Sequence, residues 1–307
     1  MISKILDLKK KKNAVILAHN YQLPEVQDIA DFAGDSLGLS IEASKTKADI
    51  IVFCGVHFMA ETAKILNPSR KVLMPDPKAG CPMANMITEA QVSNLRQQHP
   101  NTKIVCYINT TAAVKAECDI CCTSGNAVEV VRSLGSGEIV FVPDQYLGSW
   151  VEEKLGRKMI LWHGFCNIHV KILPEHIIEA KKKHPEAKVM CHPECTPGVR
   201  ALSDIVASTS KMIEYPASIV ETRFIASPTP TFIIATEVGI LHQLKKKYPD
   251  KDFYPAYEGA ICPNMKLTSL EKVLWCLDEE SGEINVEPDT AKRAAACIKK
   301  MLELKTG

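Results

Sequence analysis

The fold is decided by three short apolar stretches that each run into polar side chains: NAVILAHN (13–20), TKIVCYINTT (102–111) and AKVMCHPEC (187–195). His19, Tyr107 and His192 fall at similar places in them, with Tyr107 88 residues after His19 and His192 85 residues after Tyr107. Self-similarity at a nearly fixed interval marks a repeated structural unit. Each stretch is therefore predicted to be a buried parallel strand that ends in a polar loop.

Further apolar stretches follow each of these in the same way. A second set is ADIIVFCG (48–55), CDICCTSGNA (118–127) and SDIVASTSKM (203–212), and a third is KVLMPD (71–76), EIVFVPD (138–144) and TFIIATE (231–237). Stretches with helical periodicity separate them, such as LPEVQDIADFAGDSLGLSIEASK (23–45) and PEHIIEAKKKHP (174–185). Strands that alternate with helices indicate α/β units with parallel sheets.

We therefore expect three similar α/β/α sandwich domains with parallel sheets, arranged around a central cavity. Ligands of such sheets bind beyond the carboxyl ends of the strands, where the polar clusters lie. The expected domains are residues 1–82 together with a C-terminal helix at 286–307, then 83–169, then 170–285.

Composition narrows the class of protein. The 307 residues are 46% hydrophobic and 24% charged, which is typical of a globular chain. A net charge of +1 gives no reason to expect a nucleic-acid or membrane partner. The start, MISKILDLKKKK, suits a short amphipathic helix better than a signal peptide, and no transmembrane run is found. Together with the twelve cysteines, these features of the sequence favour a reducing, cytoplasmic location.

Three cysteines stand out because each follows a strand-like run. Cys81 comes after KVLMP, Cys166 after KMILW and Cys262 after DFYPAY, with separations of 85 and 96 residues. Three thiolates from three loops can hold one iron–sulfur cluster or metal. They would leave one coordination position unfilled, as in catalytic rather than structural metal sites.

The remaining cysteines have simpler interpretations. Cys191 and Cys195 flank His192 and are rival zinc ligands, although this segment offers too few partners for a complete set. The cysteines that lie in apolar or helical patterns are expected to fill the core, and Cys121 and Cys122 stay ambiguous. The expected core fillers are Cys54, Cys106, Cys118, Cys276 and Cys297.

Several polar residues at strand ends have side chains suited to catalysis. His19 and Tyr21 follow one strand, and His192 and Glu194 follow another, so both sets can move protons. Hydroxyl residues near expected helix starts suit phosphate or carboxylate, although helix capping is the simpler role for each alone. These are Ser36, Ser124 and Thr209. No glycine-rich dinucleotide or P-loop motif is present.

Taken together, these segments resemble the quinolinate synthases, the iron–sulfur enzymes of de novo NAD synthesis. The resemblance covers essentially the whole chain. It rests on ILAHNYQLPEVQDIADFAGDSL, FMAETAKILNP, CPMAN, YINTTA, TSGNAVEV, HGFCNIH, HPEC and NMK.

The resemblance implies a reaction and a cofactor. Iminoaspartate would condense with dihydroxyacetone phosphate to give quinolinate, with loss of phosphate and two waters, and an iminoaspartate-producing enzyme would be a functional partner. One 4Fe–4S cluster would be held by Cys81, Cys166 and Cys262, with its fourth iron open as a Lewis acid. The implied acid–base residues are Tyr21, Tyr107, His192 and Glu194, and the implied substrate-holding residues are His19, Ser36, Asn109, Ser124, His169 and Thr209.

Two other interpretations stay open. One is another hydro-lyase with a three-cysteine cluster, of the aconitase type, which a hydroxy-acid assay would separate. The other is a non-catalytic binding or metal-sensing protein, which the paired tyrosine, histidine and glutamate at the strand ends argue against. A brown protein purified without oxygen favours the cluster enzyme, and a colourless zinc protein favours the metal sensor.

Overall fold

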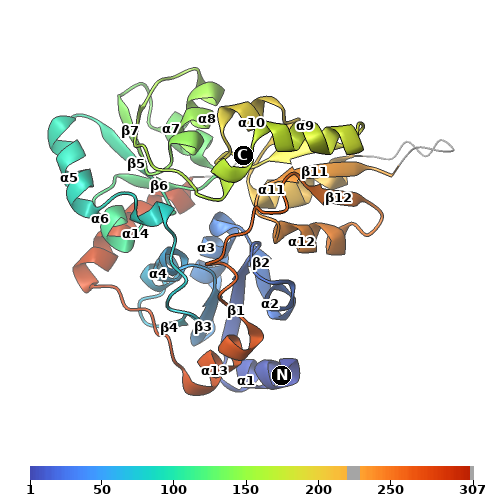
Figure 1. Ribbon diagram of the computed structural model, residues 1–307. Coiled ribbons are helices and arrows are strands. Elements are labelled where there is room, and N and C mark those ends of the chain that lie inside the picture. Colours follow the sequence, from blue (N-terminus) through green and yellow to red (C-terminus); the bar gives the residue numbers. More distant parts are fainter. Residues whose placement is uncertain (220–228, 305–307) are drawn as a thin grey trace.

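The computed structural model describes residues 1–219 and 229–304, and it contains three separate parallel sheets (Figure 1). Each sheet and its helices are called a unit here. The first unit contains β1 (Ala14–His19), β2 (Phe32–Gly34), β3 (Ile50–Cys54) and β4 (Lys71–Leu73). The second contains β5 (Lys103–Tyr107), β6 (Ile120–Cys122), β7 (Ile139–Val142) and β8 (Ile160–Leu161). The third contains β9 (Lys188–Cys191), β10 (Ile205–Val206), β11 (Thr231–Ala235) and β12 (Asp252–Pro255).

The strand order is the same in all three sheets. Within each unit the first strand lies between the second and the third, and the fourth strand is at the edge beside the third. Every pairing between these strands is parallel, so the carboxyl ends of all four strands of a sheet lie along one edge. The predicted fold class, three similar α/β/α units with parallel sheets, is confirmed.

Helices cover both faces of the sheets. The α-helices are α1 (Ile2–Lys11), α2 (Pro24–Ile29), α3 (Ser36–Lys45), α4 (His57–Leu66), α5 (Glu89–Gln98), α6 (Ala112–Ala116), α7 (Ala127–Ser133), α8 (Gln145–Leu155), α9 (Pro174–Lys183), α10 (Pro197–Ala201), α11 (Thr209–Glu214), α12 (Ile240–Lys247), α13 (Leu270–Glu279) and α14 (Pro288–Glu303). Short 3-10 turns span Met83–Asn85, His169–Lys171 and Tyr215–Ser218.

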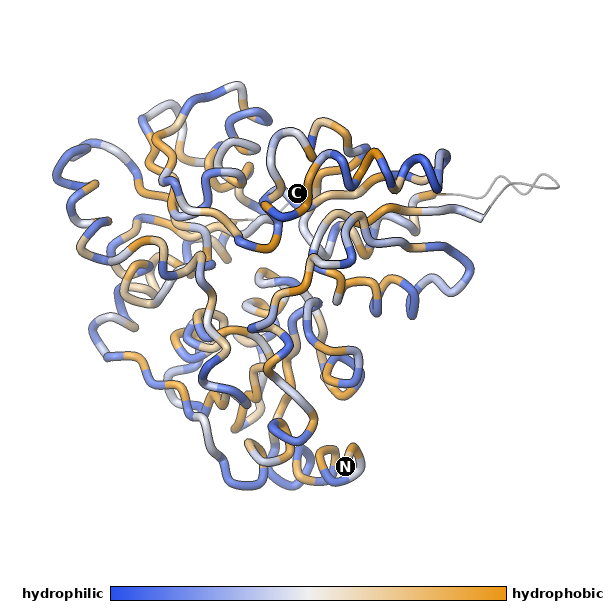
Figure 2. The backbone as a smooth tube through the Cα atoms, viewed as in Figure 1, coloured by the Kyte–Doolittle hydropathy of each residue, from blue (hydrophilic) through white to orange (hydrophobic). Residues whose placement is uncertain are grey.

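Alternation along the strands divides the core into two layers at each sheet. In β1, Leu17 packs into a cluster that includes Leu39 of α3, whereas Ile16 packs into another that includes Ile5 of α1 and Val273 of α13. Successive side chains of a strand point to opposite faces, so a strand buried on both faces is apolar throughout. Figure 2 shows this as apolar colour along the strands of all three units.

The predicted grouping of strands into sets is wrong in two places. ADIIVFCG forms β3, which matches β7 and β11 by its position in the sheet, whereas β6 and β10 match β2. KVLMPD forms β4, which matches β8 and β12 rather than β7 and β11. The strand β2 lies inside the stretch 23–45 that was predicted to be one helix. Ala30 is extended, and the Asp35 side chain accepts a hydrogen bond from the Gly38 amide to start α3. The helical periodicity on either side concealed a three-residue strand.

The last two helices return to earlier units (Figure 1). α13, expected in the third domain, packs on α1 and β3 of the first unit. α14 was expected on the first domain, but it packs chiefly against α6 and β6 of the second unit and also touches α4 of the first. The apolar face of α14 accounts for this position, because packing there buries its side chains. The buried residues are Ala294, Cys297, Ile298 and Met301. The domain boundaries themselves stay a prediction, and 220–228 and 305–307 lie outside the described residues.

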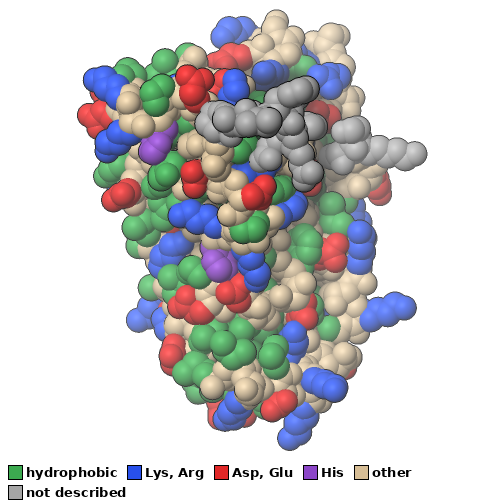
Figure 3. All heavy atoms as spheres, turned by 90° about the vertical axis from the view of Figure 1, so that its right-hand side faces the viewer, with side chains coloured by type: hydrophobic (Ala, Val, Ile, Leu, Met, Phe, Trp, Pro, Cys, Tyr) green, Lys and Arg blue, Asp and Glu red, His purple; other side chains and the backbone are tan. Residues whose placement is uncertain are grey.

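The surface is mixed in charge. On the face shown in Figure 3, basic and acidic side chains are interspersed rather than gathered by sign, which agrees with a net charge of +1. Among the described residues, no helix combines the length and apolar composition that crossing a membrane requires.

Candidate active site

One cavity brings together every residue that the sequence predicts for the site. The empty space between its walls, which includes open solvent, is about 680 Å³. The predicted residues that line it are His19, Tyr21, Ser36, Cys81, Tyr107, Asn109, Ser124, Cys166, His169, His192, Glu194, Thr209 and Cys262. They come from all three units.

The strand ends explain this convergence. His19 is the last residue of β1 and Tyr107 the last of β5, while His192 directly follows β9. β1, β5 and β9 are the first strands of their units, and each lies between the second and third strands of its sheet. The three units therefore present equivalent positions. Because parallel strands end at a common edge, polar residues there face one cavity when the three edges meet.

Glu194 lies at the centre of the polar contacts. Its Oε1 accepts a hydrogen bond from the Tyr107 hydroxyl at 2.5 Å, and its Oε2 lies 2.8 Å from Nδ1 of His169. Burial alone would raise the pKa of Glu194, but contacts with His169, His192 and the tyrosine hold that pKa below its usual range. A fully buried carboxylate is therefore kept ionised by its partners.

A run of short polar contacts continues from His169 to the first unit. Its Nε2 lies 2.8 Å from the Thr236 hydroxyl, which lies 2.6 Å from the Tyr21 hydroxyl. Tyr21, Thr236, His169, Glu194 and Tyr107 thus form a chain of close polar contacts between groups able to donate or accept protons, in which the link from His169 Nδ1 to Glu194 is a close approach without hydrogen-bond geometry. We call this the proton chain. It joins residues of all three units.

Thr236 was missed in reading the sequence. It directly follows β11, the third strand of its sheet, and therefore ends in the same place as the predicted residues. The stretch TFIIATE carries the same signal as the others, an apolar strand that ends in polar residues.

A second set of contacts surrounds His192. Its Nε2 lies 3.1 Å from the Ser124 hydroxyl, and its ring stacks on that of His169 with centroids 4.7 Å apart. The Thr209 hydroxyl accepts a hydrogen bond from the Asn20 amide at 3.0 Å. These contacts fix side chains from three units against one another.

Burial decides the protonation state of the rings. It lowers the pKa of both His19 and His192 to about 3, so both imidazoles are neutral at pH 7. It also raises the pKa of Tyr21 and of Tyr107 well above the usual value, so both hydroxyls keep their protons. The cavity therefore offers neutral donors beside the Glu194 carboxylate.

Two predicted residues have polar atoms available to a ligand. Ser36 is the first residue of α3, whose cap is the neighbouring Asp35, so the Ser36 hydroxyl is not needed for capping. The buried Oδ1 of Asn109 has no hydrogen-bond partner among the described residues. Unpaired buried polar atoms are costly, so this oxygen favours a ligand that donates to it.

The three predicted cysteine ligands follow equivalent strands. Cys81, Cys166 and Cys262 lie in the loops after β4, β8 and β12, the fourth strand of each sheet, and all three are half-buried free thiols. Burial raises the pKa of each, to about 12 for Cys81, and Glu194 raises the pKa of Cys81 and Cys166 further. The pKa of each thiol is therefore also shifted by another charged group of the same cavity.

The loop of Cys262 is anchored by a buried ion pair. Glu237 Oε1 accepts a hydrogen bond from the Cys262 amide at 3.1 Å and lies 3.0 Å from Lys266 Nζ. The same ammonium donates to the backbone carbonyl of Tyr21. Sequence reasoning missed both charged residues, although Glu237 is the second residue after β11. The pair ties the cysteine loop of the third unit to the strand end of the first.

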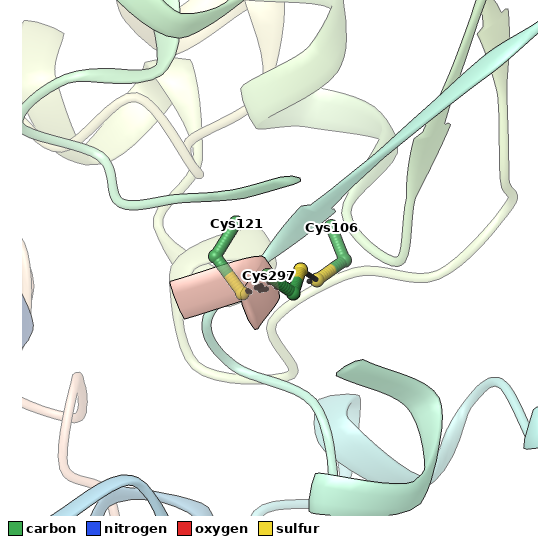
Figure 4. Close-up of side chains that lie close together, drawn as sticks. All are labelled: Cys106, Cys121 and Cys297. Carbon is green, nitrogen blue, oxygen red and sulfur yellow. Dashed lines mark hydrogen bonds between the residues drawn. The ribbon is translucent and has the colours of Figure 1, made fainter. Parts of the chain in front are cut away.

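A different group of cysteines lies outside the cavity. The sulfurs of Cys106, Cys121 and Cys297 are buried and close together, so they could hold a metal (Figure 4). Two of these were expected to be core fillers, and nothing in their sequence spacing indicated that they meet. Cys191 and Cys195 belong to no metal-ligand group found among the described residues. A further group, Cys166, His169 and Glu194, lies within the cavity itself.

This fold and site together define an α/β enzyme built from three parallel-sheet units around one polar cavity. The family model described as "Quinolinate synthetase A protein" matches residues 3–303. The chain therefore belongs to the quinolinate synthase family, enzymes of NAD biosynthesis.

Individual relatives support this over nearly the full length. The chain is 50% identical over 301 residues to a protein of Dehalococcoides mccartyi strain CBDB1, which covers 98% of this chain and 97% of the relative. It is also 50% identical over 305 residues to a protein of Methanosarcina barkeri, with coverage of 99% and 98%. Both relatives are named quinolinate synthase.

Proposed function

We propose that this protein condenses iminoaspartate with dihydroxyacetone phosphate to quinolinate, releasing one phosphate and two waters. Family membership supports the product, and the resemblance of the motifs suggests the two substrates. The observation that carries the proposal is the proton chain from Tyr21 to Tyr107, which lies in the same cavity as three free cysteines. Loss of two waters and closure of a ring require several proton transfers, and such a chain supplies donors and acceptors for them.

The residues present fit a 4Fe–4S cluster held by Cys81, Cys166 and Cys262. The cysteine sulfurs around such a cluster stand roughly 6–7 Å apart, given metal–sulfur bonds near 2.3 Å. These three thiols line one cavity. Their sulfur atoms do not all lie within 4.8 Å of one another. A bound cluster would supply a Lewis-acidic iron for a carboxylate or hydroxyl oxygen and would keep the thiols ionised.

The proton chain divides the acid–base work between its ends. Glu194 is held ionised and serves as the base, with Tyr107 and His169 as its proton partners. Tyr21 serves as a donor at the other end. The Thr236 hydroxyl contacts both His169 and the Tyr21 hydroxyl, so it orients the Tyr21 hydroxyl. Neutral His192 can accept a proton or donate one, according to the orientation of Ser124.

The remaining hydroxyls and amides suit the anionic parts of both substrates. Ser36, Ser124 and Thr209 offer hydroxyls to phosphate or carboxylate oxygens, and the unpaired Asn109 Oδ1 can accept from an imine or hydroxyl. His19, being neutral, binds by hydrogen bonding rather than by charge. A largely enclosed cavity also limits hydrolysis of the imine.

The test is an assay on protein reconstituted with iron and sulfide without oxygen. Iminoaspartate is formed in place by an oxidase or dehydrogenase acting on aspartate, and dihydroxyacetone phosphate is added. We expect quinolinate and phosphate in equal amounts. Release of phosphate without quinolinate would contradict the proposed condensation.

The aconitase-type alternative is tested in the same preparation. Hydration or dehydration of hydroxy acids by the reconstituted protein, without quinolinate formation, would favour that reaction instead. A protein that binds dihydroxyacetone phosphate and turns over neither substrate set would favour the non-catalytic alternative. A cytoplasmic location and coupling to an iminoaspartate-producing enzyme stay predictions.

A further inference from the structure

The core of the second unit contains a thiol group that the catalytic proposal does not use. The Sγ–Sγ distances are 3.4 Å between Cys106 and Cys121, 3.2 Å between Cys121 and Cys297, and 3.9 Å between Cys106 and Cys297 (Figure 4). All three side chains are buried. None of them lines the catalytic cavity.

The fold explains why these sulfurs converge. Cys106 of β5 and Cys121 of β6 are direct partners in the parallel register, so their side chains leave the same face of the sheet. α14 packs over β6 and carries Cys297 on its buried face. The three ligands thus come from two neighbouring strands and a helix that is 176 residues away from Cys121 in the chain.

We propose that Cys106, Cys121 and Cys297 hold a single divalent thiophilic ion of the zinc class, which fastens the C-terminal helix α14 to the second sheet. The spacing selects a single ion over a cluster. Sulfurs around one tetrahedral ion with bonds near 2.3 Å stand roughly 3.8 Å apart, whereas those around a four-iron cluster stand roughly 6–7 Å apart. Separations of 3.2, 3.4 and 3.9 Å approach the first value only.

A buried cation stands beside the proposed ion site. Lys115 of α6 is fully buried, and no carboxylate among the described residues forms an ion pair with it. Its ammonium donates to the Thr110 carbonyl and lies 5.4 Å from the centre of the Phe58 ring. An isolated buried charge is costly, and a thiolate site of net negative charge balances it.

Cys118 is the nearest candidate for a fourth ligand. Its thiol interacts with Cys106 and at present donates to the Val114 carbonyl at 3.2 Å. Ligation by this half-buried thiol would require it to leave the Val114 carbonyl. Four thiolates and one divalent ion carry a net charge of −2, half of which Lys115 offsets.

Such a site would form as the chain folds, because its ligands are closed off from solvent in the finished structure. Its role is structural. α14 joins the second unit to α4 of the first, so fastening this helix holds two walls of the catalytic cavity in register. The proposal does not depend on the reaction that the cavity performs.

The test measures zinc and iron separately in protein produced with zinc in the medium and purified without oxygen. We expect about one zinc per chain, bound by three or four sulfurs near 2.3 Å in X-ray absorption at the zinc edge, where iron does not interfere. The Cys121→Ser variant should retain less than about a tenth of this zinc, since each ligand is needed for a closed site. Its iron content after reconstitution should equal that of the wild type.

Cys122→Ser is the matched control, because Cys122 is also buried and is the next residue of β6, pointing to the opposite face. It should keep its zinc. Wild-type protein without zinc would overturn the proposal, and so would zinc bound by nitrogen and oxygen ligands. Equal zinc in wild type and Cys121→Ser would also overturn it. Because zinc is read in the wild type, a variant that fails to fold does not decide the question. Failure of quinolinate synthesis would leave these zinc results unchanged.

Discussion

Replacing Glu194 by glutamine tests the proton chain at its centre. The carboxylate is fully buried and is held between the Tyr107 hydroxyl at 2.5 Å and His169 at 2.8 Å. Glutamine keeps the shape and one acceptor oxygen but removes the negative charge of the carboxylate. Loss of a positioned general base costs about 10²–10⁴ in rate, which corresponds to about 2.7–5.4 kcal/mol of transition-state stabilisation.

The assay is quinolinate formation under saturating substrates, with iron content and thermal unfolding measured on the same samples. Glu153→Gln is the control, because Glu153 is half-exposed and pairs with Arg200 outside the cavity. We expect full iron content and at least about a hundredfold lower turnover for Glu194→Gln alone. Near-normal turnover with an intact cluster would refute the assignment of Glu194 as the base.

A double variant sharpens this prediction. Because Tyr107 donates directly to Glu194, the two side chains should act as one unit. Turnover of Tyr107→Phe combined with Glu194→Gln should therefore be close to that of the slower single variant. Losses that multiply would show that the two residues serve separate steps.

Three further predictions concern individual contacts. Tyr21→Phe removes the hydroxyl that meets Thr236 at 2.6 Å and should lower turnover by about 10²-fold without loss of iron, so unchanged turnover would make Tyr21 a lining residue only. Burial lowers the pKa of His192 from 6.5 to about 3, so the unfolded chain binds an extra proton as pH falls below 6.5 and stability is lost down to about pH 3. Between pH 7.5 and 5.5 the free energy of unfolding, measured by urea denaturation, should fall by about 1.4 kcal/mol more in the wild type than in His192→Gln. An equal fall in the two proteins would contradict this. Glu237→Gln should speed anaerobic iron release to a chelator, because Glu237 holds the Cys262 amide at 3.1 Å, and an unchanged release rate would count against that anchoring role.

Much of the architecture was predictable because the strands are buried on both faces. Stretches such as NAVILAHN and TFIIATE are apolar throughout and end in polar residues, which is a strong local signal. The three-residue strand β2 could not be predicted in this way, since Phe32–Gly34 is too short to show a period of its own. The position of α14 was also hidden, because amphipathic periodicity shows that a helix has a buried face but not which unit covers it.

The candidate site was predictable as a set of positions and not as a network. Strand-end placement brought the predicted residues into one cavity, but the contact between Tyr21 and Thr236 joins residues 215 apart in the chain. Contacts between units depend on how three sheets dock, which no local pattern encodes. The same holds for Cys106, Cys121 and Cys297, whose sulfurs meet only because α14 folds back across β6.

The most direct measurement compares four variants after anaerobic reconstitution: Cys81→Ser, Cys166→Ser, Cys262→Ser and Cys54→Ser, the last a buried cysteine that does not line the cavity. Iron, sulfide and quinolinate formation are measured on each beside the wild type. We predict about four irons per chain and quinolinate synthesis in the wild type and in Cys54→Ser, and loss of both in the other three. Full iron and full turnover in Cys166→Ser, or their loss in Cys54→Ser alone, would contradict this assignment.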